Sequence, residues 1–252
     1  MRHGALAWGL RLLLLHVSEG QQLALSAANG IISANGQALK IKGVNYWGLE
    51  GELAVLGGLR FRPLDDILDL LADEGFNAIR VPLAVQHILT NPLPNQYEIH
   101  GGRNADLKNI SYLELLDAVV ARAAPRGLLI LLDMHRLAPG AASHHEGAGG
   151  HDDTPLWYNL LVPEAQVAEA WRVLATRYCG AWNILGGDVY NEPFASSWGS
   201  SGNWGWGSPA ATDFKRGATL LAGEILGICP RWLIIVSGVR AARGTTEAGG
   251  RL

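Results

Sequence analysis

The stretch "ILGGDVYNEP" at residues 184–193 decides the fold of this chain. It begins with apolar and small residues, as a strand buried on both faces does, and a proline closes it. Asn191 and Glu192 stand side by side where this strand is predicted to end. Packing alone gives no reason for a carboxylate at that position, so Glu192 is the first candidate for a functional residue.

Four other apolar stretches are predicted to be strands of the same kind, with amphipathic stretches between them. The strands are "IKGVNYW" (41–47), "FNAIRVPL" (76–83), "LLILLDMH" (128–135) and "WLIIVSGV" (232–239). The predicted helices cover residues 63–75, 111–127, 163–180 and 212–230. Buried strands that alternate with helices indicate a parallel sheet covered by helices. Before the first of these strands, Asn35-Gly36 predicts an N-terminal β-hairpin with a type I′ turn.

The connections between these elements are unequal in length. Each helix passes almost directly into the next strand, as at Gly75-Phe76 and Gly127-Leu128, whereas long loops at 136–162 and 194–211 follow the strands. Long loops at the carboxyl ends of strands build the active sites of (β/α)8 barrels of the TIM-barrel type, which is the predicted α/β fold. A doubly wound sheet is the alternative, but no glycine-rich phosphate motif follows the first strand.

The overall composition limits the kinds of partner, such as nucleic acid or a membrane, that the protein is expected to bind. The chain has 252 residues, a net charge of -3 and 17% charged residues, and it shows no basic patch for nucleic acid and no apolar run long enough to span a membrane. Its first residues, "MRHGALAWGLRLLLLHVSEG", predict a signal peptide over residues 1–20 and hence a secreted, extracellular protein. The alternative is an irregular N-terminal segment of an intracellular protein.

Two cysteines are too few for a disulfide scaffold or a four-cysteine zinc site. Cys179 and Cys229 each end a predicted helix, at the same face of a barrel. They could pair if their Cα atoms lie within about 7 Å. Two separate buried thiols are the interpretation that we favour.

Polar side chains occur at the ends of several predicted strands. They are Arg80, Asp133, His135, Asp188, Asn191 and Glu192. A buried arginine without a partner is costly, so Arg80 needs a carboxylate on a nearby strand, and we expect Asp133 and Asp188 to stabilise this rim. Two structural alternatives remain, in which Arg80 and Glu192 pair only to close the barrel and His135 is a core histidine.

Two loop segments carry further candidates. "SSWGSSGNWGWGS" places Trp198, Trp204 and Trp206 among small polar residues, which suits stacking on the apolar faces of sugar rings, unless the loop folds its tryptophans onto the barrel. "SHHEGAGGHDD" at 143–153 holds three histidines, but its glycines place them loosely. We therefore expect a solvated polar loop, with no metal and no cofactor.

Five motifs together resemble glycoside hydrolase family 5, the cellulase family. They are "GVNYWG", "FNAIRVPL", "LLILLDMH", "VYNEPF" and "WLIIVSGV", in this order and spacing over residues 28–239, with "LWYN" before the third helix. The resemblance implies a retaining hydrolase of β-1,4-glucan, with β-mannan as the nearest alternative, and a β-linked polysaccharide or oligosaccharide as ligand. It implies that Glu192 is the general acid/base, that Asn191 binds the sugar 2-hydroxyl, and that Arg80 and His135 support the catalytic carboxylates. Tyr46, Trp47 and Trp157 are expected to line the cleft.

The same resemblance places the second carboxylate, the nucleophile, at the end of a seventh strand. Residues 21–239 match only the first five βα units, and residues 240–252 are an irregular tail without apolar periodicity. The expectation is a truncated barrel that lacks the nucleophile and is inactive as written. The alternatives are a non-catalytic carbohydrate-binding or interaction fragment and a metal-dependent barrel hydrolase that uses the histidine-rich loop. The sequence does not determine the oligomeric state.

Overall fold

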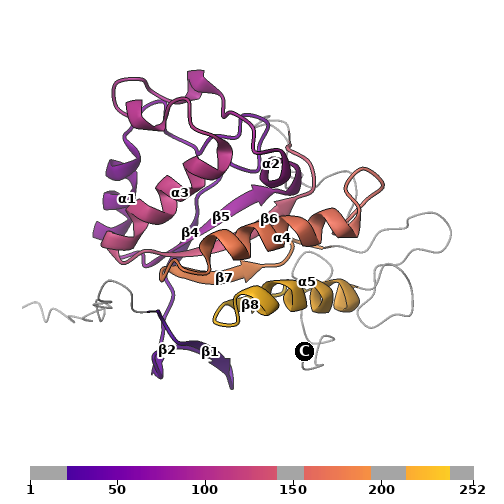
Figure 1. The fold of residues 1–252 in the computed structure, drawn as a ribbon. Helices are drawn as coiled ribbons and strands as arrows, with labels where there is room; N and C mark the ends of the chain where they lie inside the picture. Colours follow the sequence, from indigo (N-terminus) through magenta and orange to yellow (C-terminus); the bar gives the residue numbers. More distant parts are fainter. Residues whose placement is uncertain (1–21, 141–155, 194–213, 239–252) are drawn as a thin grey trace, which may run out of the picture.

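A computed structural model describes residues 22–140, 156–193 and 214–238 of the chain (Figure 1). Its main sheet has five strands in the order in which they occur along the chain, and every neighbouring pair is parallel. The strands are β4 (Gly43–Asn45), β5 (Ala78–Ala84), β6 (Leu129–Arg136), β7 (Ile184–Asp188) and β8 (Leu233–Ile235). This arrangement confirms the parallel sheet predicted from the alternation of strands and helices.

Four long helices connect these strands and lie along one face of the sheet (Figure 1). They are α1 (Leu64–Asp73), α3 (Tyr112–Ala123), α4 (Glu164–Tyr178) and α5 (Phe214–Ile228). The short helix α2 (Val85–Thr90) and the 3-10 turns η1 (Gln96–Glu98), η2 (Ala105–Leu107) and η3 (Ala124–Arg126) were not expected from the sequence. In the part of the chain that the structure describes, no helix is long and apolar enough to cross a membrane.

The core lies between the sheet and these helices, because alternate side chains of a strand point to opposite faces. On β6, Ile130, Leu132 and Met134 are fully buried in the cluster under the helices. On β7 the sheet approaches α4 so closely that a Cβ at Gly187 would lie 2.8 Å from the Trp171 ring. A larger residue at 187 therefore could not face this helix, while the opposite face of the sheet stays available for polar side chains.

A separate antiparallel sheet lies at the N-terminal side. It contains β1 (Leu25–Ala28), β2 (Ile31–Ala34) and β3 (Gln37–Ala38), and Figure 1 shows β1 and β2 below the main sheet. Asn35 and Gly36 join β2 to β3 with φ of 52° and 76°, the two positive values that a type I′ turn requires. Leu23 lies in a second buried cluster with Ala78 and Leu129, the first residues of β5 and β6, so this segment covers the amino ends of the strands.

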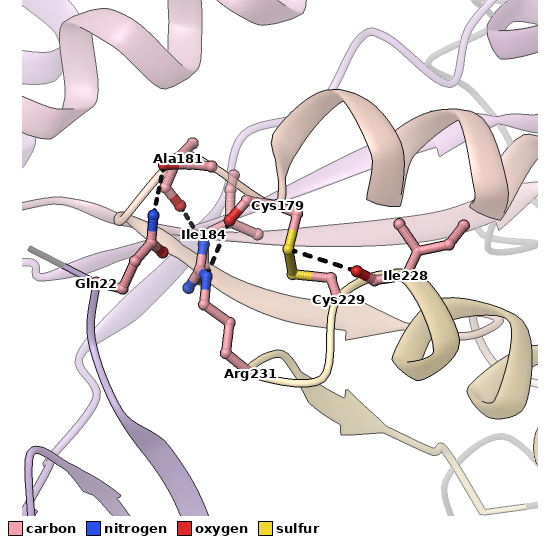
Figure 2. Close-up of a disulfide and its surroundings, with 8 residues drawn as sticks. Gln22, Cys179, Ala181, Ile184, Ile228, Cys229 and Arg231 are labelled. Carbon is pink, nitrogen blue, oxygen red and sulfur yellow. Dashed lines mark hydrogen bonds between the residues drawn. A yellow bond between two sulfur atoms is a disulfide. The ribbon is translucent and has the colours of Figure 1, made fainter. Parts of the chain in front are cut away.

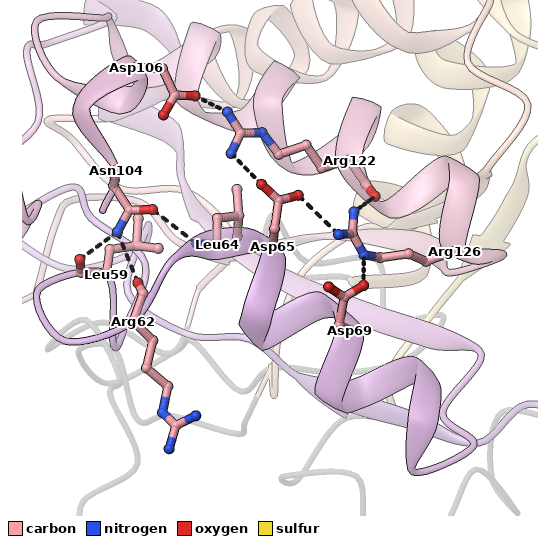
Figure 3. A network of polar contacts seen from close by, with 9 residues as sticks. All are labelled: Leu59, Arg62, Leu64, Asp65, Asp69, Asn104, Asp106, Arg122 and Arg126. Atoms are coloured by element: carbon pink, nitrogen blue, oxygen red, sulfur yellow. Dashed lines mark hydrogen bonds and ion pairs between the residues drawn. The ribbon is translucent and has the colours of Figure 1, made fainter. Parts of the chain in front are cut away.

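Ion pairs connect neighbouring outer helices. Figure 3 shows Asp65 of α1 between two arginines, with Arg122 Nη1 at 3.0 Å and Arg126 Nη2 at 3.1 Å. Arg172 of α4 pairs with Glu224 of α5 at 2.8 Å. All of these groups are at least partly exposed, so each pair contributes at most about 1 kcal/mol. These ion pairs serve mainly to position one helix along the next.

A disulfide joins the ends of α4 and α5, and the expectation of two separate thiols is therefore wrong. Cys179 and Cys229 are bonded, with Cα atoms 5.4 Å apart (Figure 2). The same place holds Arg231, which donates to the carbonyl oxygens of Cys179 at 3.0 Å and of Ile184 at 3.1 Å. The guanidinium satisfies carbonyl groups beyond the end of α4, which lack partners within the helix. Arg231 thus forms a second link, beside the disulfide, between the end of α4 and the segment after α5.

Reduction of this disulfide is expected to lower the free energy of unfolding by about 4 kcal/mol, since the bond closes a long loop in the unfolded chain. The sequence separation of 50 residues sets the size of that loop. Urea denaturation of the 252-residue chain with and without dithiothreitol measures the effect. A double Cys179→Ser/Cys229→Ser variant should show the lower stability in both conditions. Equal midpoints for the oxidised and reduced wild type would contradict the prediction.

Candidate active site

The polar residues of three neighbouring strands meet on the face of the sheet opposite the helices. In the parallel register, Asp133 of β6 pairs with Asp188 of β7 and with Pro82 of β5, two residues after Arg80. Arg80, Asp133 and His135 alternate with core residues of their own strands, so their side chains project away from the helices. The chain order of the strands thus places one arginine and two carboxylates together at the carboxyl ends of the sheet.

Arg80 is the centre of this cluster. Its Nε and Nη2 donate to Asp188 Oδ2 at 3.1 and 2.9 Å, and its Nη1 lies 2.9 Å from Asp133 Oδ2. Nη2 also donates to Asn191 Oδ1 at 2.8 Å, and Nη1 donates to Asn45 Oδ1 at 3.4 Å. The carboxylates that Arg80 required are therefore Asp133 and Asp188, as expected for the rim, and the alternative in which Arg80 and Glu192 close the barrel is not what the structure contains. Asn45, at the end of β4, was missed in the sequence.

His135 and Asn191 complete a closed ring of hydrogen bonds with Arg80 and Asp133. His135 Nδ1 lies 2.6 Å from Asp133 Oδ2, and Asn191 Nδ2 lies 3.4 Å from His135 Nε2. Since Asp133 can only accept, His135 carries its proton on Nδ1, which leaves Nε2 to accept from Asn191. Arg80 donates to the side-chain oxygen of Asn191, and His135 faces the side-chain nitrogen of Asn191. The orientations of the Asn191 amide and the His135 ring are therefore determined by their neighbours. One Asn191 N–H remains available to a ligand.

Asp188 is the acid that this arrangement perturbs. Burial of the carboxyl group, with the charge of Asp133 beside it, raises the pKa of Asp188 to about 7, although the Arg80 guanidinium acts in the opposite direction. Only 4% of Asp188 is exposed, and the second oxygens of both aspartates, Asp133 Oδ1 and Asp188 Oδ1, are buried without a hydrogen bond within the described structure. Two carboxylates thus share one arginine, and the pair holds a proton to near neutral pH.

This proton predicts how stability changes with pH. Because the folded pKa of Asp188 lies above that of an unfolded aspartate, about 3.9, the folded chain binds more protons between pH 4 and 7. Stability therefore falls as pH rises through that window, by about 2–4 kcal/mol from this group. Asp188→Asn removes the titration, so its stability relative to wild type should increase from pH 4.5 to pH 7.5. Thermal unfolding across this range tests it, and a constant difference would contradict it.

Glu192 lies beyond the end of its strand. β7 ends at Asp188, five residues before the end of the stretch at 184–193, and the backbone of Asn191 then donates to the Met134 carbonyl at 2.9 Å. Glu192 has φ of 41°, in the left-handed region that asparagine tolerates and glutamate seldom adopts. Such backbone strain is concentrated at functional sites, where the surrounding contacts maintain it. The partly buried Glu192 is thus placed beside the ring that orients Asn191.

The aromatic candidates divide by burial. Trp47 is 54% exposed, and it lies on Gly57, where an added Cβ would approach its ring to 3.0 Å. Tyr46 and Trp157 are buried in the hydrophobic core, 7% and 0% exposed, so the structure places them beneath the surface rather than along a cleft. Burial also raises the pKa of Tyr46. Trp198, Trp204 and Trp206 lie outside the described residues, as does the histidine-rich loop.

Among the described ranges 22–140, 156–193 and 214–238, no group of three metal-ligating side chains is found. The chemistry of the cluster also disfavours a cation there, because the Arg80 guanidinium already occupies the position between the two aspartates. The groups on this face are suited to hydrogen bonding with a neutral polar ligand and to proton transfer.

Comparison with known proteins gives the family. The family described as Cellulase (glycosyl hydrolase family 5) matches residues 32–248. An endoglucanase of Paenibacillus polymyxa is 34% identical over 211 residues, which are 84% of this chain and 48% of that protein. The major extracellular endoglucanase of Xanthomonas campestris pv. campestris is 33% identical over 227 residues, 89% of this chain and 43% of that protein. The chain belongs to glycosyl hydrolase family 5, and it spans about half the length of these relatives.

Solved structures agree with this assignment. An endocellulase from Pyrococcus horikoshii in complex with cellotetraose has a TM-score of 0.74 and 27% identity, over 86% of this chain and 58% of that one. The catalytic domain of the Xanthomonas campestris endoglucanase has a TM-score of 0.69 and 33% identity, over 81% and 54%. The five-stranded α/β sheet therefore has the architecture of part of a (β/α)8 glycoside hydrolase.

Proposed function

We propose that this chain carries the acid/base half of the active site of an endo-β-1,4-glucanase. The observation that supports this most is the hydrogen-bond ring of Arg80, Asp133, His135 and Asn191 directly before Glu192, in a chain of family 5. The ring fixes the Asn191 amide, and Glu192 with its carboxyl group is the next residue in the chain. These are the two kinds of group needed to hold a sugar and to protonate a departing oxygen.

Cleavage of a glycosidic bond needs an acid on the leaving oxygen and a second carboxylate on the other side of the sugar. In this proposal Glu192 is the general acid and later the general base. Asn191 donates its remaining N–H to the sugar 2-hydroxyl, because its oxygen is already used by Arg80. Arg80, Asp133 and His135 do not touch the substrate but hold Asn191 in that orientation. Trp47 supplies an apolar surface for a sugar ring.

The second carboxylate of a retaining mechanism stands about 5–5.5 Å from the first and forms a covalent intermediate. The family places it on a seventh strand, whereas the described sheet contains five parallel strands. We propose that the 252-residue chain binds β-glucan but does not hydrolyse it at an enzymatic rate. The name of the Xanthomonas relative, a major extracellular endoglucanase, and the apolar N-terminal stretch support a secreted protein that meets its polysaccharide outside the cell.

Binding of a cello-oligosaccharide tests the proposal directly. The 252-residue chain is expected to bind cellotetraose in isothermal titration calorimetry, and Trp47→Ala should weaken binding by about tenfold through loss of one aromatic contact. Leu160→Ala, a change at an exposed apolar side chain on another loop, is the control and should bind like wild type. Equal binding of cellotetraose and mannotetraose would contradict a glucan preference, and no binding at all would contradict the proposed function.

A further inference from the structure

Two large aromatic side chains lie exposed on loops that follow neighbouring strands. Phe61, in the loop between β4 and α1, is 68% exposed, and Tyr97 of η1, in the connection after β5 and α2, is 87% exposed. Neither belongs to the hydrophobic core. Exposed aromatic rings lose the stabilisation that burial would give them, so two on adjoining loops are a candidate contact surface.

The two loops are fastened to each other. Arg60 joins the two loops. Its guanidinium lies over the Phe61 ring, 5.9 Å from the ring centroid, and it pairs at 3.3 Å with Glu98, the residue next to Tyr97. Asn95 Oδ1 accepts from the Tyr97 backbone at 2.9 Å and holds the turn that presents this ring. Phe61 and Tyr97 are thus held on one rigid platform, which we call the Phe61/Tyr97 surface.

Asn104 is the buried clamp beneath this surface (Figure 3). Its amide nitrogen donates to the carbonyl oxygens of Leu59 at 2.7 Å and Arg62 at 2.9 Å, and its oxygen accepts from the Leu64 backbone at 2.9 Å. Asn104 has no exposed area, and these three bonds use most of its hydrogen-bonding capacity. The clamp fixes the chain on both sides of Phe61. A ligand therefore meets a surface that is already ordered, with little entropy to lose.

The surface is joined to the candidate active site through the loop between β4 and α1. Trp47, the exposed aromatic residue of that site, lies on Gly57, and the chain from Gly57 to Phe61 spans at most about 14 Å. The exposed rings Trp47, Phe61 and Tyr97 therefore belong to one layer of loops at the carboxyl ends of β4 and β5. An extended ligand held at Trp47 can reach the neighbouring rings.

We propose that the Phe61/Tyr97 surface is a second glycan-binding site, outside the catalytic cleft, for a long β-linked glucan. The flat rings contact the apolar faces of sugar residues, while Arg60 and Glu98 between them offer hydrogen bonds to hydroxyl groups. The site favours polymer over short oligosaccharide, because a long chain can contact Trp47 and both rings at the same time. This inference rests on the proposed function and names a further part of the molecule that serves it.

Retention of the 252-residue chain on phosphoric-acid-swollen cellulose, measured beside its affinity for cellotetraose, tests the proposal. Phe61→Ala/Tyr97→Ala is expected to weaken retention on cellulose by about tenfold, as loss of two stacking contacts predicts, and to leave cellotetraose binding unchanged. Tyr97→Phe should retain wild-type binding to both. The matched control is Leu160→Ala/Leu161→Ala, which removes two equally exposed apolar side chains from another loop.

The outcomes separate the two claims. Unchanged retention of Phe61→Ala/Tyr97→Ala on cellulose would overturn the second site while leaving the proposed function intact. An equal loss in the leucine control would also overturn it, since the effect would then be one of general surface hydrophobicity. Failure of the wild type to bind either cellulose or cellotetraose would overturn the proposed function, and the second site with it. Circular dichroism of each variant confirms that the compared proteins are folded.

Discussion

Arg80→Met is expected to destabilise the 252-residue chain by about 3–5 kcal/mol at pH 7.5, the cost of leaving buried charge without its partner. Asp133 and Asp188 are 0% and 4% exposed, and Arg80 lies within 3.1 Å of an oxygen of each. Methionine keeps most of the volume of the side chain, so the loss is electrostatic rather than a cavity. Urea denaturation followed by tryptophan fluorescence measures it.

A smaller cost at low pH would identify the cause. Removal of Arg80 takes away the group that lowers the pKa of Asp188, so the carboxyl group should stay protonated to a higher pH. At pH 5 the variant then carries less uncompensated charge, and the destabilisation should shrink. The control is Arg62→Met, because Arg62 is exposed and its hydrogen bonds in the described structure involve its backbone, with the N–H donating to Gly58 and the carbonyl accepting from Asn104. Its effect should be within about 0.5 kcal/mol, and an equally small effect of Arg80→Met would contradict the prediction.

The strands and the long helices could be predicted because their pattern is local. Apolar runs and helical spacing along β5, β6 and α4 are sufficient to identify them, and Asn35-Gly36 encodes its own turn. The end of β7 could not be found in this way. Asn191 and Glu192 follow an apolar run, but the Asn191 backbone turns to bond with Met134 of another strand, and Glu192 adopts a left-handed backbone. A contact between distant residues determines that geometry.

The residues of the site could be predicted from the sequence, but which of them pair with one another could not. Burial implied that Arg80 needs an acid, and the strand ends supplied three candidates in Asp133, Asp188 and Glu192. Only the register of β6 against β7 selects the two aspartates. Trp157 shows the same limit, since "LWYN" does not reveal that Gly217 of a later helix leaves room for its ring in the core. The disulfide depends likewise on how the ends of α4 and α5 meet.

The catalytic role that we propose for Glu192 predicts the largest effect, and a chimeric protein can measure it. Residues 22–238 are joined to the C-terminal part of the Paenibacillus polymyxa endoglucanase, the relative with 34% identity over 211 residues. This chimera is expected to hydrolyse carboxymethylcellulose, because the added units complete the barrel and supply the second carboxylate. The 252-residue chain alone should show no such turnover. Robust hydrolysis by that chain, abolished by Glu192→Gln, would contradict the proposed division of the active site.

In the chimera, Glu192→Gln should lower kcat by about 10²–10⁴-fold, the usual contribution of a positioned general acid. Glutamine preserves size and hydrogen bonding, so binding of cellotetraose and the melting temperature should stay near those of the parent. The matched control is Glu169→Gln on the exposed side of α4, which should leave kcat unchanged, since Glu169 contacts only Arg172 there. An aryl glycoside with a good leaving group needs little protonation in the first step, so its kcat/KM, which reports that step alone, should fall much less than that of carboxymethylcellulose. If Glu192→Gln lowered kcat/KM equally for both substrates, Glu192 would not be the acid, because its proton would not be what the first step lacks.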